Sequence, residues 1–167
     1  MLPESGRLYL LAALDNTPAT LAALLSGFPA DDPIWKTQPD PERFSLREIV
    51  AHLADWEAVF GERFERTVSE DHPKLRRPNP GERAVDQGYA DADPVERLTH
   101  LQASRTARTA WLRSLPEDAW GRAIDLDQMV DISLTGLVSL MLGHDAYHIR
   151  QVSEWLAAAV HQRHGDA

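Results

Sequence analysis

Hydrophobic positions recur at helical spacing in four stretches of the chain. In the clearest of them the apolar residues fall three or four positions apart, at Ile49, Leu53, Trp56, Phe60 and Phe64. This period is typical of an amphipathic helix that buries one face. Ser45, with Glu48 three residues later, forms a capping box just before the stripe. The pattern therefore predicts a helix that begins at this serine.

An earlier helical stretch covers residues 7–26. Thr17 followed by Pro18 is a good N-cap with proline at the first helical position. We therefore expect a short helix over residues 8–14 and a separate main helix that starts at Pro18.

Two further helical stretches follow in the second half of the chain. The third begins at the cap signature Asp93-Pro94 and ends before Pro116, and the fourth runs over about residues 133–162. Four long amphipathic helices with almost no strand signal predict an all-α fold, a four-helix bundle in one domain over residues 1–167.

The connections between these helices are rich in proline, glycine and charge. Residues 28–43 hold four prolines and Trp35, which we expect to fold onto the end of the bundle. Residues 69–92 form a long connection, of a kind that is often functional or mobile. In the last connection, residues 123–129 alternate too weakly to predict a strand.

Composition narrows the function. The 167 residues include 17 Lys and Arg against 26 Asp and Glu, for a net charge of −9. This acidic balance argues against nucleic acid as a partner, because phosphate neutralisation needs an excess of basic residues. The chain has no cysteine, so disulfides, thiolate ligands and a cysteine nucleophile are excluded. Any metal must be held by His, Asp or Glu.

The sequence also lacks the usual targeting signals. The first residues show no basic region followed by an apolar run, so no signal peptide is predicted. The longest apolar-rich segment that we identify, Leu134 to Leu142, is too short to cross a membrane. We therefore expect a cytoplasmic protein with no membrane partner.

Three histidines carry the strongest functional signal. His144 and His148 lie one turn apart on the fourth helix, so their side chains point the same way. His52 lies on the apolar stripe of the second helix. Three inward imidazoles are costly to bury unless something shared satisfies them, and a metal ion does so. The other four histidines, His72, His100, His161 and His164, are expected at the surface.

Polar neighbours could support this site. Asp145 follows His144 in a pattern similar to the His-Glu-x-x-His of zinc proteases, so it is our candidate catalytic residue, either orienting a histidine or acting as a general base. Gln151 could contact a water on the metal, and Asp55 could orient His52 or be solvated. Glu57 is expected at the surface.

These motifs together resemble a known family. Phe44-Ser45-Leu46-Arg47-Glu48 followed by His52-Leu53-Ala54-Asp55, and later His144-Asp145-Ala146-Tyr147-His148 followed by Gln151, are similar to the DinB-like superfamily of bacterial four-helix proteins. The resemblance covers nearly the whole chain in order. One departure is Tyr147, where many members carry a further histidine.

The resemblance implies a bundle of up-down-down-up topology with a long crossover between helices two and three. It also implies a divalent metal held by His52, His144 and His148, and often a homodimer. Some members transfer groups to low-molecular-weight thiols such as bacillithiol, mycothiol or glutathione.

We therefore expect a metal-dependent enzyme that acts on a small molecule. The ion would be zinc or nickel before iron or manganese, since three neutral imidazoles suit late first-row ions. The reaction would be hydrolysis or transfer to an external thiol, a cofactor that the absence of cysteine fits. The alternative is a dimeric metal-binding or stress-response module without turnover, and a third interpretation is a structural bundle whose histidines only fill the core.

Overall fold

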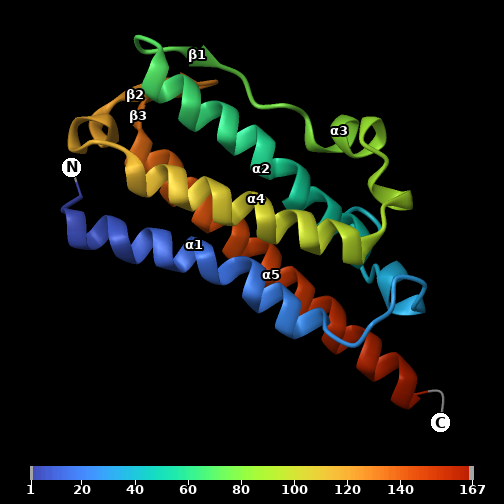
Figure 1. The fold of residues 1–167 in the computed structure, drawn as a ribbon. Helices are drawn as coiled ribbons and strands as arrows, with labels where there is room; N and C mark the ends of the chain where they lie inside the picture. The colour runs from blue at the N-terminus through green and yellow to red at the C-terminus, as the bar shows by residue number, and fades with distance from the viewer. Residues whose placement is uncertain (1, 166–167) are drawn as a thin grey trace.

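Four long helices build the molecule. The computed structural model describes residues 2–165, and the side chains of residues 2–161. The bundle helices are α1 (Glu4–Leu25), α2 (Leu46–Ser69), α4 (Pro94–Ser114) and α5 (Leu134–Gly165). Both α1 and α2 pack against α4 and α5. Figure 1 shows α1 and α5 running one way and α2 and α4 the other, which confirms the up-down-down-up topology.

The long crossover follows from this topology. Because α2 and α4 run in the same direction, the chain must return along the length of the bundle between them, as Figure 1 shows. The return path is more ordered than the sequence suggested. It contains β1 (Lys74–Leu75), the short helix α3 (Pro80–Asp86) and the 3-10 turn η2 (Tyr89–Asp91). Asn79 caps α3 by accepting hydrogen bonds from the backbone of the first turn.

The start of α2 agrees with the sequence prediction. The Ser45 hydroxyl accepts a hydrogen bond from the Glu48 backbone, and the Glu48 carboxylate accepts one from the Ser45 backbone at 2.8 Å. Before it, the connection contains a 3-10 helix, η1 (Pro33–Lys36), which carries Trp35 into the core. The indole of Trp35 is fully buried and donates to the Pro29 carbonyl.

The predicted break in the first helix is wrong. α1 runs through Pro18 without interruption. Proline lacks the N–H that would bond to the Leu14 carbonyl one turn earlier. The Nη1 of Arg105 takes that place, donating to the Leu14 carbonyl at 2.8 Å. Thr17 does not cap a helix; its hydroxyl donates instead to Asp145.

A small sheet is the second departure from the prediction. β2 (Ala123–Leu126) pairs antiparallel with β3 (Met129–Ser133) and parallel with β1. The hairpin needs Asp127 at a φ of 53°, in the left-handed region that Asp tolerates better than most residues. Every second residue of β2 is buried, Ile124 and Leu126, so the weak alternation in the sequence was a real strand signal.

The sequence prediction also overlooked the apolar character of α1. Among the described helices, α1 is long and apolar enough to cross a membrane by length and composition, with a mean hydropathy of 1.3. In this structure one stripe of α1 packs into the bundle, burying Leu11, Leu14, Leu21 and Leu25.

Two large apolar clusters with a polar layer between them make up most of the core, and a third, small cluster joins the crossover to α2. One cluster lies at the sheet end and includes Phe64, Leu112 and Leu137. The other lies at the opposite end and includes Trp35 and Trp155. Many of the buried polar side chains fall between the two clusters along the helices: Thr17, His52, Glu57, Arg105, Asp145, His148 and Gln151. Apolar burial at both ends therefore holds the helices together, and the middle carries the chemistry.

Candidate metal centre

The three predicted histidines meet in this polar layer. His52 comes from α2 and the pair His144 and His148 from α5, and one ring nitrogen of each lies within 4.8 Å of the others. The Nε2 atoms of His52 and His144 are 2.9 Å apart. In the described part of the chain, this is the one group of such side chains close enough to share an ion.

The surroundings keep two of these imidazoles, His52 and His148, neutral. Burial, followed by repulsion from His148 and His144, lowers the pKa of His52 from 6.5 to about 2. Burial and the neighbouring His144 lower the pKa of His148 to about 4. Both rings are therefore neutral at pH 7, the form in which imidazole binds a metal.

Gln151 determines which nitrogen of His148 is free. The Oε1 of Gln151 lies 3.0 Å from the Nδ1 of His148, and both side chains are buried. Because the amide oxygen can only accept, Nδ1 carries the proton and Nε2 keeps its lone pair for the site. Gln151 thus supports a histidine, and it also lines the cavity, so its contact with a water on the ion stays a prediction.

Asp145 lies behind the histidines. It is 1% exposed, and its Oδ2 accepts from Thr17 at 2.8 Å and from Arg105 at 2.6 Å. Its Oδ1 is 3.8 Å from the Nδ1 of His144. These partners hold the pKa of Asp145 below its usual value although burial acts to raise it. The placement favours an orienting role over that of a general base.

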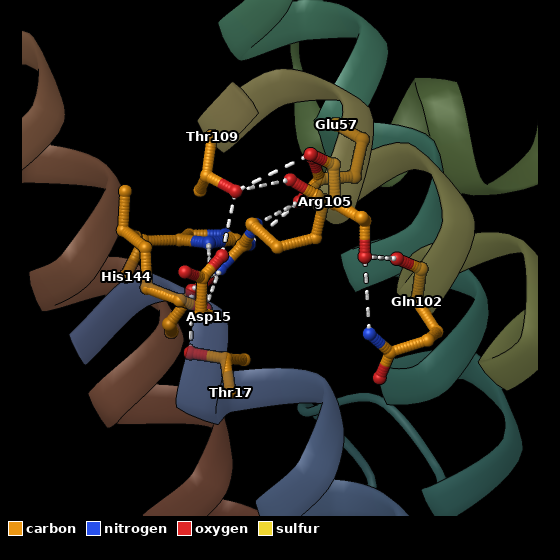
Figure 2. A network of polar contacts seen from close by, with 10 residues as sticks. Asp15, Thr17, Glu57, Gln102, Arg105, Thr109 and His144 are labelled. Carbon is orange, nitrogen blue, oxygen red and sulfur yellow. Dashed lines mark hydrogen bonds and ion pairs between the residues drawn. The ribbon is translucent and has the colours of Figure 1, made fainter. Parts of the chain in front are cut away.

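Arg105 of α4 connects the other three bundle helices in this layer. Figure 2 shows its guanidinium among side chains from α1, α2 and α5. It bonds Glu57 and Asp145, and all three side chains are at least 96% buried. Glu57 was expected at the surface, and that prediction is wrong, because the structure buries its side chain. Burial raises the pKa of Glu57, and Arg105 opposes the rise. Beside it, Thr109 donates to Asp15 at 2.6 Å.

The other polar candidates lie apart from the histidines. Asp55 does not orient His52; it accepts bonds from Arg83 and from the Tyr89 hydroxyl, and so fastens the crossover to α2. The surface histidines His72, His100 and His161 are exposed, as predicted, and the side chain of His164 lies outside the described residues.

A cavity of about 340 Å³ opens onto the histidines. All three line it, together with aromatic and polar side chains from the bundle and Pro80 of the crossover: Glu42, Arg43, Phe44, Trp56, Tyr147 and Gln151. Tyr147, the position that departs from the family pattern, is exposed at this cavity and accepts a hydrogen bond from Arg43 at 3.0 Å. Three imidazole nitrogens facing a cavity fit one divalent ion with positions left open.

Sequence reasoning missed one residue beside this site, Arg63. It lies three residues after Phe60 and seven after Trp56, so helical spacing places it on the inward stripe of α2. In the structure it is 5% exposed. A charged residue on an apolar stripe was the signal that could have revealed it.

Comparison with known proteins agrees with the fold. The family model of the DinB superfamily matches residues 13–152. Among solved structures, YfiT from Bacillus subtilis, described as a probable metal-dependent hydrolase with an unusual four-helix bundle topology, superposes with a TM-score of 0.86. It is 23% identical, and the match covers 95% of this chain and 90% of that one. A search of curated proteins finds no match.

Proposed function

Because the chain belongs to the DinB superfamily and presents three imidazoles to a cavity, we propose that it is a metal-dependent hydrolase of a small molecule. The observation that carries the proposal is the approach of two Nε2 atoms to 2.9 Å. One ion accepts both lone pairs, and a third from His148. The description of YfiT as a probable metal-dependent hydrolase supports the same reaction class.

The residues of the chain fit such an ion. His52, His144 and His148 would hold it, and zinc or nickel suits a set of three imidazoles without thiolate or carboxylate. When bound, the ion would supply Lewis-acid activation of a water molecule or of the substrate's carbonyl. Gln151 keeps the His148 lone pair directed at the site, and Asp145 supports His144 from behind.

The cavity walls would exclude bulk water from the reacting group. Phe44 and Trp56 lie against the ring of His52, with ring centroids 5.2 and 4.9 Å away. The polar rim is made by Arg43 and Tyr147. A small substrate could therefore reach the histidines from one side, while the side of Asp145 and Arg105 stays closed.

A second candidate reaction is transfer to an external thiol. It is favoured by the absence of cysteine, since no side-chain thiolate would compete with an incoming thiol for the ion. An activity assay of the metal-loaded protein tests this reaction, with glutathione or another small thiol added to an electrophile. A homodimer and the choice between zinc and nickel stay predictions.

The test loads the purified protein with zinc or with nickel and measures hydrolysis of small esters such as 4-nitrophenyl acetate. We expect turnover that chelation removes and that His144→Ala lowers at least about a hundredfold. His100→Ala is the matched control, since this histidine is exposed on α4, and it should keep full activity. Stoichiometric metal without turnover in any assay would contradict the hydrolase and favour a binding module.

A further inference from the structure

A second cavity, of about 390 Å³, lies on the other side of the histidine cluster. It shares three lining residues with the first: Trp56, Pro80 and His144. Most of its remaining wall is apolar and comes from α2, the small sheet and α5: Phe60, Leu126, Met129 and Leu140. His144 thus faces two adjoining cavities, and a molecule in the second one would place one end beside it.

Arg63 lines this apolar cavity. Its Nη2 is buried and, in the described part of the chain, has no hydrogen-bond partner. The guanidinium lies over the rings of Phe60 and Trp56, at 5.2 and 5.7 Å from their centroids. The nearby Asp127 is engaged by Arg77, whose Nε lies 2.7 Å from its carboxylate. A buried cation without a hydrogen-bonded anion is costly, so a negative group is expected to complete it.

Trp56 carries a second buried donor without a partner in the described chain. It also lines the second cavity, and its buried indole Nε1 is without an acceptor among the described residues. Buried N–H groups of native proteins are almost always paired. Two unpaired donors on the walls of one cavity point to a ligand that brings acceptor oxygens.

The charge around the second cavity also favours an anionic ligand, although the whole chain is acidic. A third cavity adjoins the second through Arg63, Arg77 and Pro78. Its lining contains six basic side chains and Glu62, and the basic ones are Arg63, Arg66, Lys74, Arg76, Arg77 and Arg83. Arg66, Lys74, Arg77 and Arg83 are each paired with a carboxylate, so the excess positive charge comes from Arg63 and Arg76. This excess favours the approach of small anions.

We propose that the second cavity is a substrate subsite for a small carboxylate with an aromatic or branched apolar body. The carboxylate would bind Arg63 and the indole N–H of Trp56, and the apolar body would lie against Phe60 and Met129. The other end would reach His144. The reaction of such a substrate at His144 rests on the proposed hydrolase function. The recognition of its carboxylate rests on Arg63 alone.

The test compares phenylacetate with its neutral isostere phenylacetamide by calorimetric titration of the full-length protein, zinc-loaded and after chelation. We expect phenylacetate to bind at least about tenfold more tightly, because it pairs with a buried guanidinium. Arg63→Met should reduce this preference to within about twofold in both forms, while zinc binding is retained. Arg113→Met is the control: it removes the same charge from an exposed position on α4 outside these cavities, and should keep the preference.

Two outcomes would overturn the subsite: no preference for phenylacetate in the wild type, or an unchanged preference in Arg63→Met. Should that variant fail to fold, Leu140→Trp replaces it. Leu140 is 40% exposed at the cavity, so a bulky ring there should block phenylacetate without a change of charge. Unaltered binding in Leu140→Trp would equally contradict the proposal. Because binding is measured without turnover, failure of the hydrolase would leave the anion preference intact.

Discussion

The polar layer of this bundle has a closed half and an open half. In the closed half, formed by Thr17, Glu57, Arg105 and Asp145, one guanidinium bonds two buried carboxylates and a carbonyl, and among the described atoms of these four side chains only the Oε2 of Glu57 is left without a partner. In the open half, formed by His52, His144, His148, Trp56 and Arg63, several buried N–H or N atoms lack a partner and cavities adjoin them. Both halves are buried at the same level of the fold, so burial alone does not distinguish structural from functional polarity.

The difference teaches where to look for a ligand. A satisfied buried network stabilises one arrangement of helices and asks for nothing more. An unsatisfied one costs free energy in the isolated chain, and that cost is recovered when a ligand binds. Substitutions in the closed half should therefore affect folding first, and substitutions in the open half should affect binding first.

The largest effect is expected in the closed half. Arg105→Met would leave Glu57 and Asp145 buried without their cation, which should lower the free energy of unfolding by about 3–5 kcal/mol. Urea denaturation measures this. Arg113→Met on the same helix is the control, since its pair with Asp15 is much more exposed and should contribute about 1 kcal/mol or less. Equal losses in the two variants would remove the distinction between the halves.

In the open half, metal should stabilise the fold through the histidines. Zinc at a free concentration of about 100 times its dissociation constant should add about 2.7 kcal/mol to the free energy of unfolding. His144→Ala should abolish this gain and change the metal-free protein much less, because its side chain is 21% exposed. Thermal denaturation with and without zinc measures both. A zinc-dependent shift that persists in His144→Ala would place the ion elsewhere.

A smaller effect, on zinc affinity, is expected from Gln151, which orients the metal-binding His148. Gln151→Leu removes the acceptor for the Nδ1 proton of His148, and should weaken zinc binding by about tenfold to a hundredfold. Competition with a chromogenic chelator gives the affinity. Gln102→Leu, at an exposed position on α4, should leave it unchanged. An affinity within twofold of wild type in Gln151→Leu would mean that His148 needs no such support.

A further effect is a slope against pH in the metal-free protein. Folding lowers the pKa of His52 to about 2 and that of His148 to about 4, from 6.5. Between pH 4 and 6.5 the unfolded chain therefore binds protons that the folded chain does not. Stability from this source is complete above pH 6.5 and is lost as the pH falls, by up to about 1.4 kcal/mol per unit for each histidine.

His52→Phe isolates one of these contributions. The phenyl ring keeps the packing against Phe44 and Trp56 but cannot take a proton. Urea denaturation from pH 4 to 7 should show a shallower slope in the variant than in the wild type. Parallel slopes would mean that His52 is not held neutral by its surroundings.

Most of the fold could be predicted from local patterns. The capping box at Ser45 and the cap at Asp93 place the starts of two bundle helices, because these signals act within one turn. Pro18 misled the prediction because its effect depends on a residue 87 positions away, Arg105, which bonds the carbonyl that proline leaves free. The small sheet was missed for a similar reason: Ile124 and Leu126 alternate too briefly without their partner strands.

The candidate site likewise contains residues that local spacing predicts and residues that only tertiary packing reveals. Spacing on α5 brings His144 and His148 to one face, and the stripe on α2 turns His52 inward, so the cluster could be predicted without coordinates. The partner of Gln151 and the buried pairing of Glu57 could not, since these depend on how the helices cross. Arg63 stood on a recognisable stripe, but the unpaired Nη2 on which the proposed subsite rests is visible only in the structure.

Pro18 also has a consequence for the assembly of the bundle. An ordinary helix offers no free backbone acceptor in its middle, so a neighbour could dock one turn higher or lower at modest cost. Here the proline leaves a single interior carbonyl, that of Leu14, open to a neighbour, and Arg105 occupies it. Sliding α1 along α4 by a turn would forfeit that bond and leave the Leu14 carbonyl without a donor, so one missing hydrogen atom favours one longitudinal alignment of the two helices.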